Sequence, residues 1–397
     1  MKYLILIGDG MADQPVDSLG GRTPLEVAYT PNMDYIARKG IGGLIKTIPD
    51  SRQPGSDVAN LEVLGYDTNL YFTGRAVFEA ASMGVSLAPG DVAFRCNLIT
   101  CEGDKIVDYS AGHITTSEAS QLISLLSKEL GTERINFYPG ISYRHLLVIK
   151  EGPVEISTVP PHDIMGQKID ENLPSGEEQE LIRGLMFDSV EILSGAEVNR
   201  KRRSEGKSEA NMIWLWGQGK AIRLPTLQER FGIDGGVISA VDLVRGIGVL
   251  AGLAPIDVPG ITGYIDTNYR GKADRALDAL HQVDLVYLHV EAPDEASHNG
   301  DLAAKVQAIE NFDRLVVGRV LDGLSTFHEF KVMVLSDHRT PLAIRTHTRE
   351  AVPVAIFWES QIPDDMSAFT ELEAQKGSLR LKSGHELIQR FIERRRG

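Results

Sequence analysis

The stretch YLILIGDG, residues 3–10, decides the fold class of this chain. Consecutive apolar side chains predict a strand that is buried on both faces, as at the centre of a parallel sheet. Similar apolar runs recur at 285–290, 332–335 and 352–357, and a helical stretch at 302–321 follows the first of them. This alternation predicts an α/β domain with a central, mostly parallel sheet and helices on both faces.

The character of the sequence changes around residue 88, and the regular alternation resumes near residue 226. The intervening region is more polar and contains segments that break regular structure, such as Pro160-Pro161 and the charged run 199–209. We therefore expect a discontinuous core domain, 1–88 with 226–397, and a smaller inserted α+β domain, 89–225. A chain of 397 residues is long enough for two such domains.

The composition excludes several classes of protein. Hydrophobic residues make up 42% and charged residues 24%, which is typical of a globular protein. A net charge of -14 argues against nucleic acid as a partner, although local arginines or bound metal ions can still attract a small anion. The apolar runs are too short to span a bilayer, so we expect a cytoplasmic protein with no membrane partner. Cys96 and Cys101 cannot form a disulfide framework, and we expect both to be reduced and structural.

Polar residues suited to metal binding lie at the ends of the predicted core strands. In open α/β sheets, sites form outside the carboxyl ends of the strands, so separate strands would direct these groups into one crevice. The mixture of oxygen and nitrogen donors, without a thiolate, suits Mn²⁺, Zn²⁺ or a related ion. Six ligands are too many for one catalytic ion but suit two ions about 3.5–4 Å or somewhat more apart. The six are Asp9, Asp294, His298, Asp337, His338 and His347.

Each of these residues also has a structural interpretation. Asp9 could cap a turn, Asp294 could begin a helix, and a single histidine is more often structural than a ligand. Four strand-end groups of one chemical kind favour the metal interpretation. Ser56, in QPGSD before the helical stretch 58–64, could likewise be an ordinary helix cap. At a helix N-terminus it is also suited to a phosphate, and a bound metal would lower the pKa of its hydroxyl and make it a nucleophile.

Several short motifs of the sequence together resemble those of a known family. They are LIGDGMADQP, PGSDVANLEVLGYD, YRHLLV, GYIDTNYRGKADRALDAL, HVEAPDEASHNGDL, SDHRTP and THT. As a set they are similar to the cofactor-independent phosphoglycerate mutases of the archaeal type, within the alkaline phosphatase superfamily. The resemblance covers most of the chain and is weakest between residues 150 and 195.

The resemblance implies an alkaline-phosphatase-like core that binds two divalent ions. Mn²⁺ is the ion most expected, with Zn²⁺, Co²⁺ or Mg²⁺ as alternatives. Ser56 would take the phosphoryl group of a phosphoglycerate and form a phosphoserine. The glycerate would then reorient and accept the group on its other hydroxyl. The reaction would interconvert 3-phosphoglycerate and 2-phosphoglycerate, in glycolysis and gluconeogenesis, without bisphosphoglycerate. One ion is implied at Asp294, His298 and His347, and the other at Asp9, Ser56, Asp337 and His338.

The resemblance also implies that the inserted domain binds the glycerate. His113 and Arg144 are the candidate catalytic residues there, and Arg245 is a third, at a position where relatives often carry lysine. That change keeps the charge but alters the geometry of the donors. His145 and Arg202 are candidate substrate-binding residues, although Arg202 also fits a solvated charge run.

Two other functions remain open from the sequence. Homoserine kinase-like proteins, phosphatases and phosphopentomutases share such a metal site, and specificity would depend on the inserted domain. A non-catalytic relative would be expected to have lost a ligand or the nucleophile, and all seven positions are present here. The oligomeric state is left open.

Overall fold

The computed structural model describes residues 1–393, and the chain divides into two compact units. The core unit is Met1–Phe72 with Leu224–Gly397, and the inserted unit is Thr73–Arg223. The sequence placed the start of the inserted domain at residue 89. The inserted unit begins earlier because helix α5 (Ala76–Ser82) buries Ala76 and Ala80 in an apolar cluster with strand residues of that unit.

The core unit is built on a sheet with the order β11-β10-β12-β1-β13-β14-β2, seven strands among the described residues. β1 pairs in parallel with both β12 and β13, whereas β14 pairs antiparallel with β13 and β2. The predicted α/β class with a mostly parallel sheet is therefore confirmed. The strands are β1 (Lys2–Gly8), β2 (Ile41–Ile45), β10 (Gly235–Ile238), β11 (Leu253–Pro255), β12 (Leu285–Val290), β13 (Phe330–Leu335) and β14 (Val352–Phe357).

The register of the central strands positions the candidate site. Gly8 at the end of β1 lies opposite Val290 at the end of β12, and Ile7 lies opposite Leu335 at the end of β13. The three strands are buried along almost their entire length, which explains their continuous apolar sequences. Their carboxyl ends therefore meet at one edge, and the polar residues that follow them begin there.

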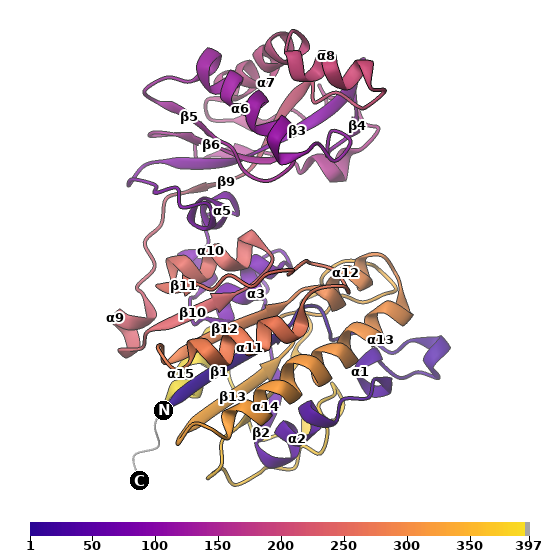
Figure 1. Ribbon diagram of the computed structural model, residues 1–397, viewed down its shortest axis with the longest axis vertical. Helices are drawn as coiled ribbons and strands as arrows, with labels where there is room; N and C mark the ends of the chain where they lie inside the picture. The colour runs from indigo at the N-terminus through magenta and orange to yellow at the C-terminus, as the bar shows by residue number, and fades with distance from the viewer. Residues whose placement is uncertain (394–397) are drawn as a thin grey trace. The chain divides into compact units, whose positions relative to one another are not determined.

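Two groups of helices pack on the core sheet. Helices α11 (Tyr269–Ala279), α13 (Leu302–Asn311) and α14 (Gly318–Leu324) lie together over one face in Figure 1. Helices α3 (Ser56–Val63) and α10 (Asp242–Leu250) contact each other and form a separate group.

The single helix predicted over 302–321 is interrupted by a π-helical turn, η3 (Phe312–Val317). Buried Asp313 in this turn accepts hydrogen bonds from the backbone N–H groups of Asn32 and Met33, at 3.1 and 2.7 Å. These residues open helix α2 (Pro31–Lys39), so η3 supplies a carboxylate to the N-terminus of a neighbouring helix.

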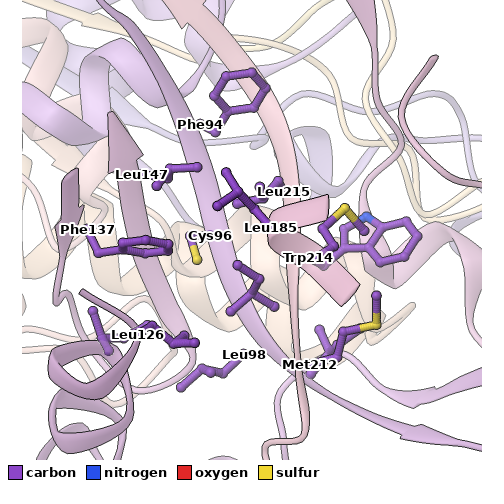
Figure 2. Close-up of a cluster of buried hydrophobic side chains, with 14 of the residues drawn as sticks. Phe94, Cys96, Leu98, Leu126, Phe137, Leu147, Leu185, Met212, Trp214 and Leu215 are labelled. Atoms are coloured by element: carbon purple, nitrogen blue, oxygen red, sulfur yellow. The ribbon is translucent and has the colours of Figure 1, made fainter. Parts of the chain in front are cut away.

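The inserted unit has its own sheet and core. Strand β3 (Val92–Glu102) pairs antiparallel with β4 (Lys105–Asp108), β6 (Arg144–Ile149) and β9 (Met212–Lys220), and β5 (Ile135–Tyr138) pairs with β6. The sequence predicted irregular structure here, but α6 (Thr116–Leu130) and α7 (Gln179–Ser194) are long, and α8 (Glu197–Ser204) covers much of the charged run. Figure 2 shows the buried core of this unit, with Phe94, Leu147 and Trp214 among its members.

Among residues 1–393, no helix has the length and apolar character that crossing a bilayer requires. Both cysteines are free thiols. Burial raises the pKa of the Cys96 and Cys101 thiols, so neither is poised to react as a thiolate.

Candidate metal centre

The predicted metal ligands of the core unit come together at the carboxyl edge of the sheet. Asp9 follows β1 directly, and its backbone N–H donates to Val290 O of β12 at 2.9 Å. Asp294 lies on α12 (Ala292–His298), the helix that follows β12. Gly10 makes the close approach of these segments possible, because it has a left-handed φ of 59° and a Cβ there would lie 2.5 Å from Asp294 Oδ1.

Asp294, His298 and His347 form the first group of donors. Asp294 Oδ2 lies 3.1 Å from His298 Nε2 and 3.5 Å from His347 Nε2, and the two histidine nitrogens are 3.0 Å apart. Asp294 and His298 are four residues apart and therefore face the same side of α12. The His298 ring is oriented through Nδ1, which lies 2.9 Å from the backbone oxygen of Arg345. A ligating histidine commonly uses its second ring nitrogen in this way.

Asp9, Asp337, His338 and Ser56 form the second group. His338 Nε2 lies 3.2 Å from Asp9 Oδ1, 3.6 Å from Asp337 Oδ2 and 3.0 Å from Ser56 Oγ. The ring is oriented by Thr340, whose Oγ1 lies 3.1 Å from His338 Nδ1. Thus all seven residues predicted as ligands converge, although they come from distant parts of the sequence.

The distances between these donors fit shared cations. Donor atoms that surround an ion at about 2.1 Å with tetrahedral angles are roughly 3.4 Å from one another. The separations in both groups lie between 3.0 and 3.6 Å. Two three-residue groups share Asp294, and within each group every residue offers one donor atom that lies within 4.8 Å of the other two. The groups are Asp294 with His298 and His347, and Asp9 with Asp294 and His338.

The electrostatics of the site also fit cations. Burial raises the pKa of Asp9 well above its usual range, and the charges of Asp337 and Asp294 raise it further. Asp9 Oδ1 is buried and has no hydrogen-bond partner among the described residues. Three carboxylates crowded away from water are strongly unfavourable unless positive charge neutralises them. Divalent ions would supply that charge, so the donor set fits the predicted group.

Ser56 is the first residue of α3 and is almost completely buried. One turn further along the helix, Asn60 Nδ2 donates to Ser56 O and to Asp337 Oδ2, both at 2.8 Å. The Asn60 side chain in turn accepts a hydrogen bond from the hydroxyl of Tyr287 on β12. These contacts fix the N-terminus of α3, the positive end of the helix dipole, beside the metal ligands.

Sequence reasoning missed the neighbours that support this site. His289 is completely buried within β12, Glu291 is the next residue but one, and Lys272 on α11 bonds to Glu291. His289 could have been noticed as the one imidazole in the apolar run LVYLHV, residues 285–290. Lys272 carries no such signal, because its role depends on how α11 packs against β12.

The comparisons with known proteins decide the family. A family model described as 2,3-bisphosphoglycerate-independent phosphoglycerate mutase matches residues 37–199. A protein of that description from Methanosarcina acetivorans is 52% identical over 396 residues, which cover 99% of this chain and 100% of the relative. This chain belongs to that family. The family and the enzyme class predicted from the sequence are therefore confirmed.

Other relatives agree. A protein from Geobacter sulfurreducens, described as a probable 2,3-bisphosphoglycerate-independent phosphoglycerate mutase, is 50% identical over 399 residues and covers 99% of this chain and 100% of its own length. The solved structure of the PH0037 protein from Pyrococcus horikoshii superposes with a TM-score of 0.84, with 29% identity and coverage of 98% of this chain and 96% of that one. A cofactor-independent phosphoglycerate mutase from Thermoplasma acidophilum gives a TM-score of 0.69 at 26% identity, covering 99% of both chains.

His113, predicted as a catalytic residue, lies on a strained loop of the inserted unit. Ala111, Gly112 and His113 have consecutive positive φ angles of 49°, 63° and 49°. Asp108 holds this loop by accepting hydrogen bonds from the backbone of Ser110 and of Gly112, at 2.7 and 2.6 Å. Non-glycine residues in this conformation are costly and often occur at functional sites. The loop leaves the His113 side chain exposed.

Arg202 stabilises the loop that carries His113. Its guanidinium is buried and donates to Ala111 O, Glu118 Oε2 and Ser208 O at 2.8, 2.9 and 2.8 Å. These three bonds use one N–H on each nitrogen of the guanidinium and hold it among internal partners. We therefore assign Arg202 to positioning the loop rather than to the substrate contact expected from the sequence.

Arg144 and His145 open strand β6 and differ in environment. Arg144 is exposed, and its guanidinium lies 5.2 Å from the centroid of the Tyr143 ring. His145 is buried and accepts a hydrogen bond from Gly140 N at 2.9 Å through Nδ1. Burial lowers the pKa of His145 to about 4, so the ring is neutral near pH 7.

Two arginines that the sequence reasoning did not select lie near Arg144. Burial lowers the pKa of Arg95 to about 10; Glu79 opposes this shift, while repulsion by Arg75 and Arg144 adds to it. The Arg95 guanidinium stacks 4.1 Å from the centroid of the Trp216 ring. Arg75 Nε is buried and has no hydrogen-bond partner within the described chain. We refer to Arg75, Arg95 and Arg144 as the arginine cluster.

Arg245, the remaining candidate, lies on α10 of the core unit and pairs with Asp257, with 2.9 Å between Nη1 and Oδ1. Asp257 is largely exposed, so this ion pair contributes little and leaves the guanidinium able to exchange partners.

Proposed function

We propose that this chain interconverts 3-phosphoglycerate and 2-phosphoglycerate through a phosphoserine at Ser56, beside a site for two divalent ions. The observation that carries the proposal is the convergence of seven donors from α3, from α12 and from the segments that follow β1 and β13. Membership of the family supports the reaction, and the donor geometry supports the metal site.

Each part of the core site has a distinct proposed task. Asp294, His298 and His347 would hold one ion, and Asp9, Asp337, His338 and Ser56 the other; we propose Mn²⁺, one of the ions that these oxygen and nitrogen donors suit. Bound divalent ions would lower the pKa of the Ser56 hydroxyl and neutralise phosphoryl charge. Ser56 Oγ attacks the phosphorus atom and receives the phosphoryl group, while the first N–H groups of α3 orient its oxygens.

The inserted unit would hold the glycerate. The arginine cluster suits the substrate carboxylate, because guanidinium groups bind carboxylates through paired hydrogen bonds. Arg95 Nε is already paired with Glu79 Oε2 at 2.9 Å, so Arg95 would use its Nη groups for this contact. His113, exposed on its fixed loop, is the acid–base residue that we propose for the inserted unit. An acidic chain would be able to bind this small substrate, with its phosphate and carboxylate groups, because the cations are concentrated locally.

A coupled assay tests the proposal. The purified chain is incubated with 3-phosphoglycerate and Mn²⁺, without bisphosphoglycerate, and enolase converts any 2-phosphoglycerate into phosphoenolpyruvate. We expect turnover by the wild type and by Ser51→Ala, an exposed serine a few residues upstream, but a loss of at least about 10³-fold in Ser56→Ala. Substantial turnover by Ser56→Ala would reject Ser56 as the nucleophile. ATP-dependent phosphorylation of homoserine by the same preparation, without mutase activity, would instead favour the kinase-like alternative.

A further inference from the structure

His162, which the sequence reasoning did not select, lies against the arginine cluster of the inserted unit. Its ring packs edge-on against Trp216, with 5.5 Å between the ring centroids, and Arg95 stacks on the same indole. The side chain is 46% exposed, and Nε2 lies 3.8 Å from Asp163 Oδ1, too far for a hydrogen bond. Within residues 1–393, the imidazole is therefore oriented by ring contacts rather than by this neighbouring carboxylate.

A second ring contact connects His162 with the loop that carries His113. Tyr109 follows Asp108, the residue that holds this loop, and its ring centroid lies 6.0 Å from that of His162. The two rings meet edge-on, as do those of His162 and Trp216. His162 thus contacts both the base of the His113 loop and the indole on which the arginine cluster is built.

The segment that carries His162 is fixed along β9. Trp214 Nε1 on this strand donates a hydrogen bond to Val159 O at 2.8 Å. Pro160-Pro161 follows, and the second proline is buried as the first residue of a 3₁₀ turn, η2 (Pro161–Ile164). The sequence indicated only a break in regular structure at the two prolines. In the folded unit, their fixed φ angles help to hold His162 at a defined position.

The surroundings of His162 keep its imidazole neutral near pH 7. Partial burial lowers the pKa of the ring, and the charges of Arg95 and Arg75 lower it further, against the opposing effect of Asp163. A neutral imidazole offers one N–H and one lone pair, whereas a guanidinium offers donors only. A hydroxyl both donates and accepts hydrogen bonds, so it suits the imidazole, while a carboxylate suits the arginines.

We propose that His162 is a further substrate-binding residue, which holds a hydroxyl of the glycerate while the arginine cluster holds the carboxylate. This inference rests on the proposed function, because it places a phosphoglycerate in the inserted unit. The contact selects a hydroxy acid over a phosphorylated acid that carries the same charged groups but lacks the hydroxyl.

A pair of ligands tests this proposal. Both 3-phosphoglycerate and 2-phosphoglycolate carry a phosphate and a carboxylate, but 2-phosphoglycolate has no hydroxyl. Calorimetric titration of the Mn²⁺-loaded chain gives a dissociation constant for each ligand. Each phosphoglycerate isomer has one free hydroxyl, so turnover during the titration leaves the comparison intact.

The substitution His162→Phe keeps a ring against Trp216 and removes both nitrogens. We expect it to weaken binding of 3-phosphoglycerate about 5- to 10-fold and to leave binding of 2-phosphoglycolate unchanged. His162→Gln, whose amide keeps a donor and an acceptor, should retain most of the preference for 3-phosphoglycerate. His281→Phe is the matched control, an exposed histidine of the core unit whose ring packs against Phe327, and should change neither constant.

Two results would overturn the proposal. Equal weakening of both ligands in His162→Phe would show that the residue acts on the shared charged groups or only supports the fold. Unchanged binding of both ligands would show that His162 does not contact the substrate. His162→Ala measures the same preference, so the test does not depend on the folding of one variant. Failure of the proposed function is distinguishable, because the wild-type chain would then bind neither ligand.

Discussion

Replacing Lys305 by Met should destabilise the core unit and weaken its metal site. Lys305 and Asp13 are buried, with 2.7 Å between Nζ and Asp13 Oδ2, and Nζ also donates to Thr340 O at 2.9 Å. Removing one partner of a buried ion pair costs about 3–5 kcal/mol. Asp13 would keep two backbone donors, Gln14 N at 2.7 Å and Leu342 N at 3.2 Å, so we expect a loss near the lower end, about 3 kcal/mol.

Thermal unfolding of the metal-free protein measures this loss. For a unit of this size, about 3 kcal/mol corresponds to a fall in Tm of roughly 6–12 °C. The double variant Lys305→Met, Asp13→Asn should recover much of the stability, because no unpaired charge is then buried. Lys201→Met, at an exposed ion pair of the inserted unit, is the matched control and should leave Tm unchanged. A loss below about 1 kcal/mol in Lys305→Met, or no recovery in the double variant, would contradict the reasoning.

Replacing Lys305 by Met should also disturb the metal ligands, because Thr340 connects Lys305 to them. This residue lies against both His338 Nδ1 and Asp294 Oδ1, and its backbone oxygen is the second acceptor of Lys305. We therefore expect Lys305→Met to weaken Mn²⁺ binding at 25 °C as well as to lower Tm.

Further predictions concern pH and the inserted unit. Asp294 raises the pKa of His298 to about 9, so near pH 7 a metal ion must displace a proton from this ring. Between pH 7 and pH 9 the affinity of this position for Mn²⁺ should therefore rise about 10- to 100-fold. The lower figure allows for solvent screening of the part-exposed ring. Calorimetric titration would show this, and a flat profile in the wild type would contradict it. Arg202→Met should release the His113 loop and lower kcat/KM about 10-fold or more while Mn²⁺ content stays unchanged; an unchanged kcat/KM would argue against the loop's role. Arg95→Met should raise KM for 3-phosphoglycerate by about 10- to 100-fold, and an unaltered KM would remove Arg95 from the carboxylate site.

The parts of the fold that the sequence predicted are those with strong, local patterns. The run at residues 3–7 forms a central strand, since a strand covered on both faces must be apolar throughout. The ligand residues Asp9, Asp337 and His338 could be expected to converge, because parallel strands end at one edge of the sheet. The sequence of β14 does not indicate that this strand pairs antiparallel with its neighbours, because its apolar residues would suit a parallel or an antiparallel strand equally well.

The supporting residues could not be predicted because their roles arise from packing. Lys272 lies on α11 and Glu291 beyond β12, and only the tertiary structure brings the amine to the carboxylate. Arg202 belongs to a charged run that suggests a solvated helix, yet its side chain is buried behind a loop far away in sequence. Likewise, α5 belongs to the inserted unit because its alanines fit against β3 and β6, a match that composition alone does not reveal.

The central claim is that Ser56 carries the phosphoryl group during turnover. Rapid acid quenching of the Mn²⁺-loaded chain with 3-phosphoglycerate, followed by mass spectrometry of its peptides, tests this directly. We predict a phosphorylated peptide that contains Ser56, formed within one turnover and absent from Ser56→Ala. Sustained mutase activity with no phosphate on Ser56, or with phosphate on a different residue, would contradict the claim.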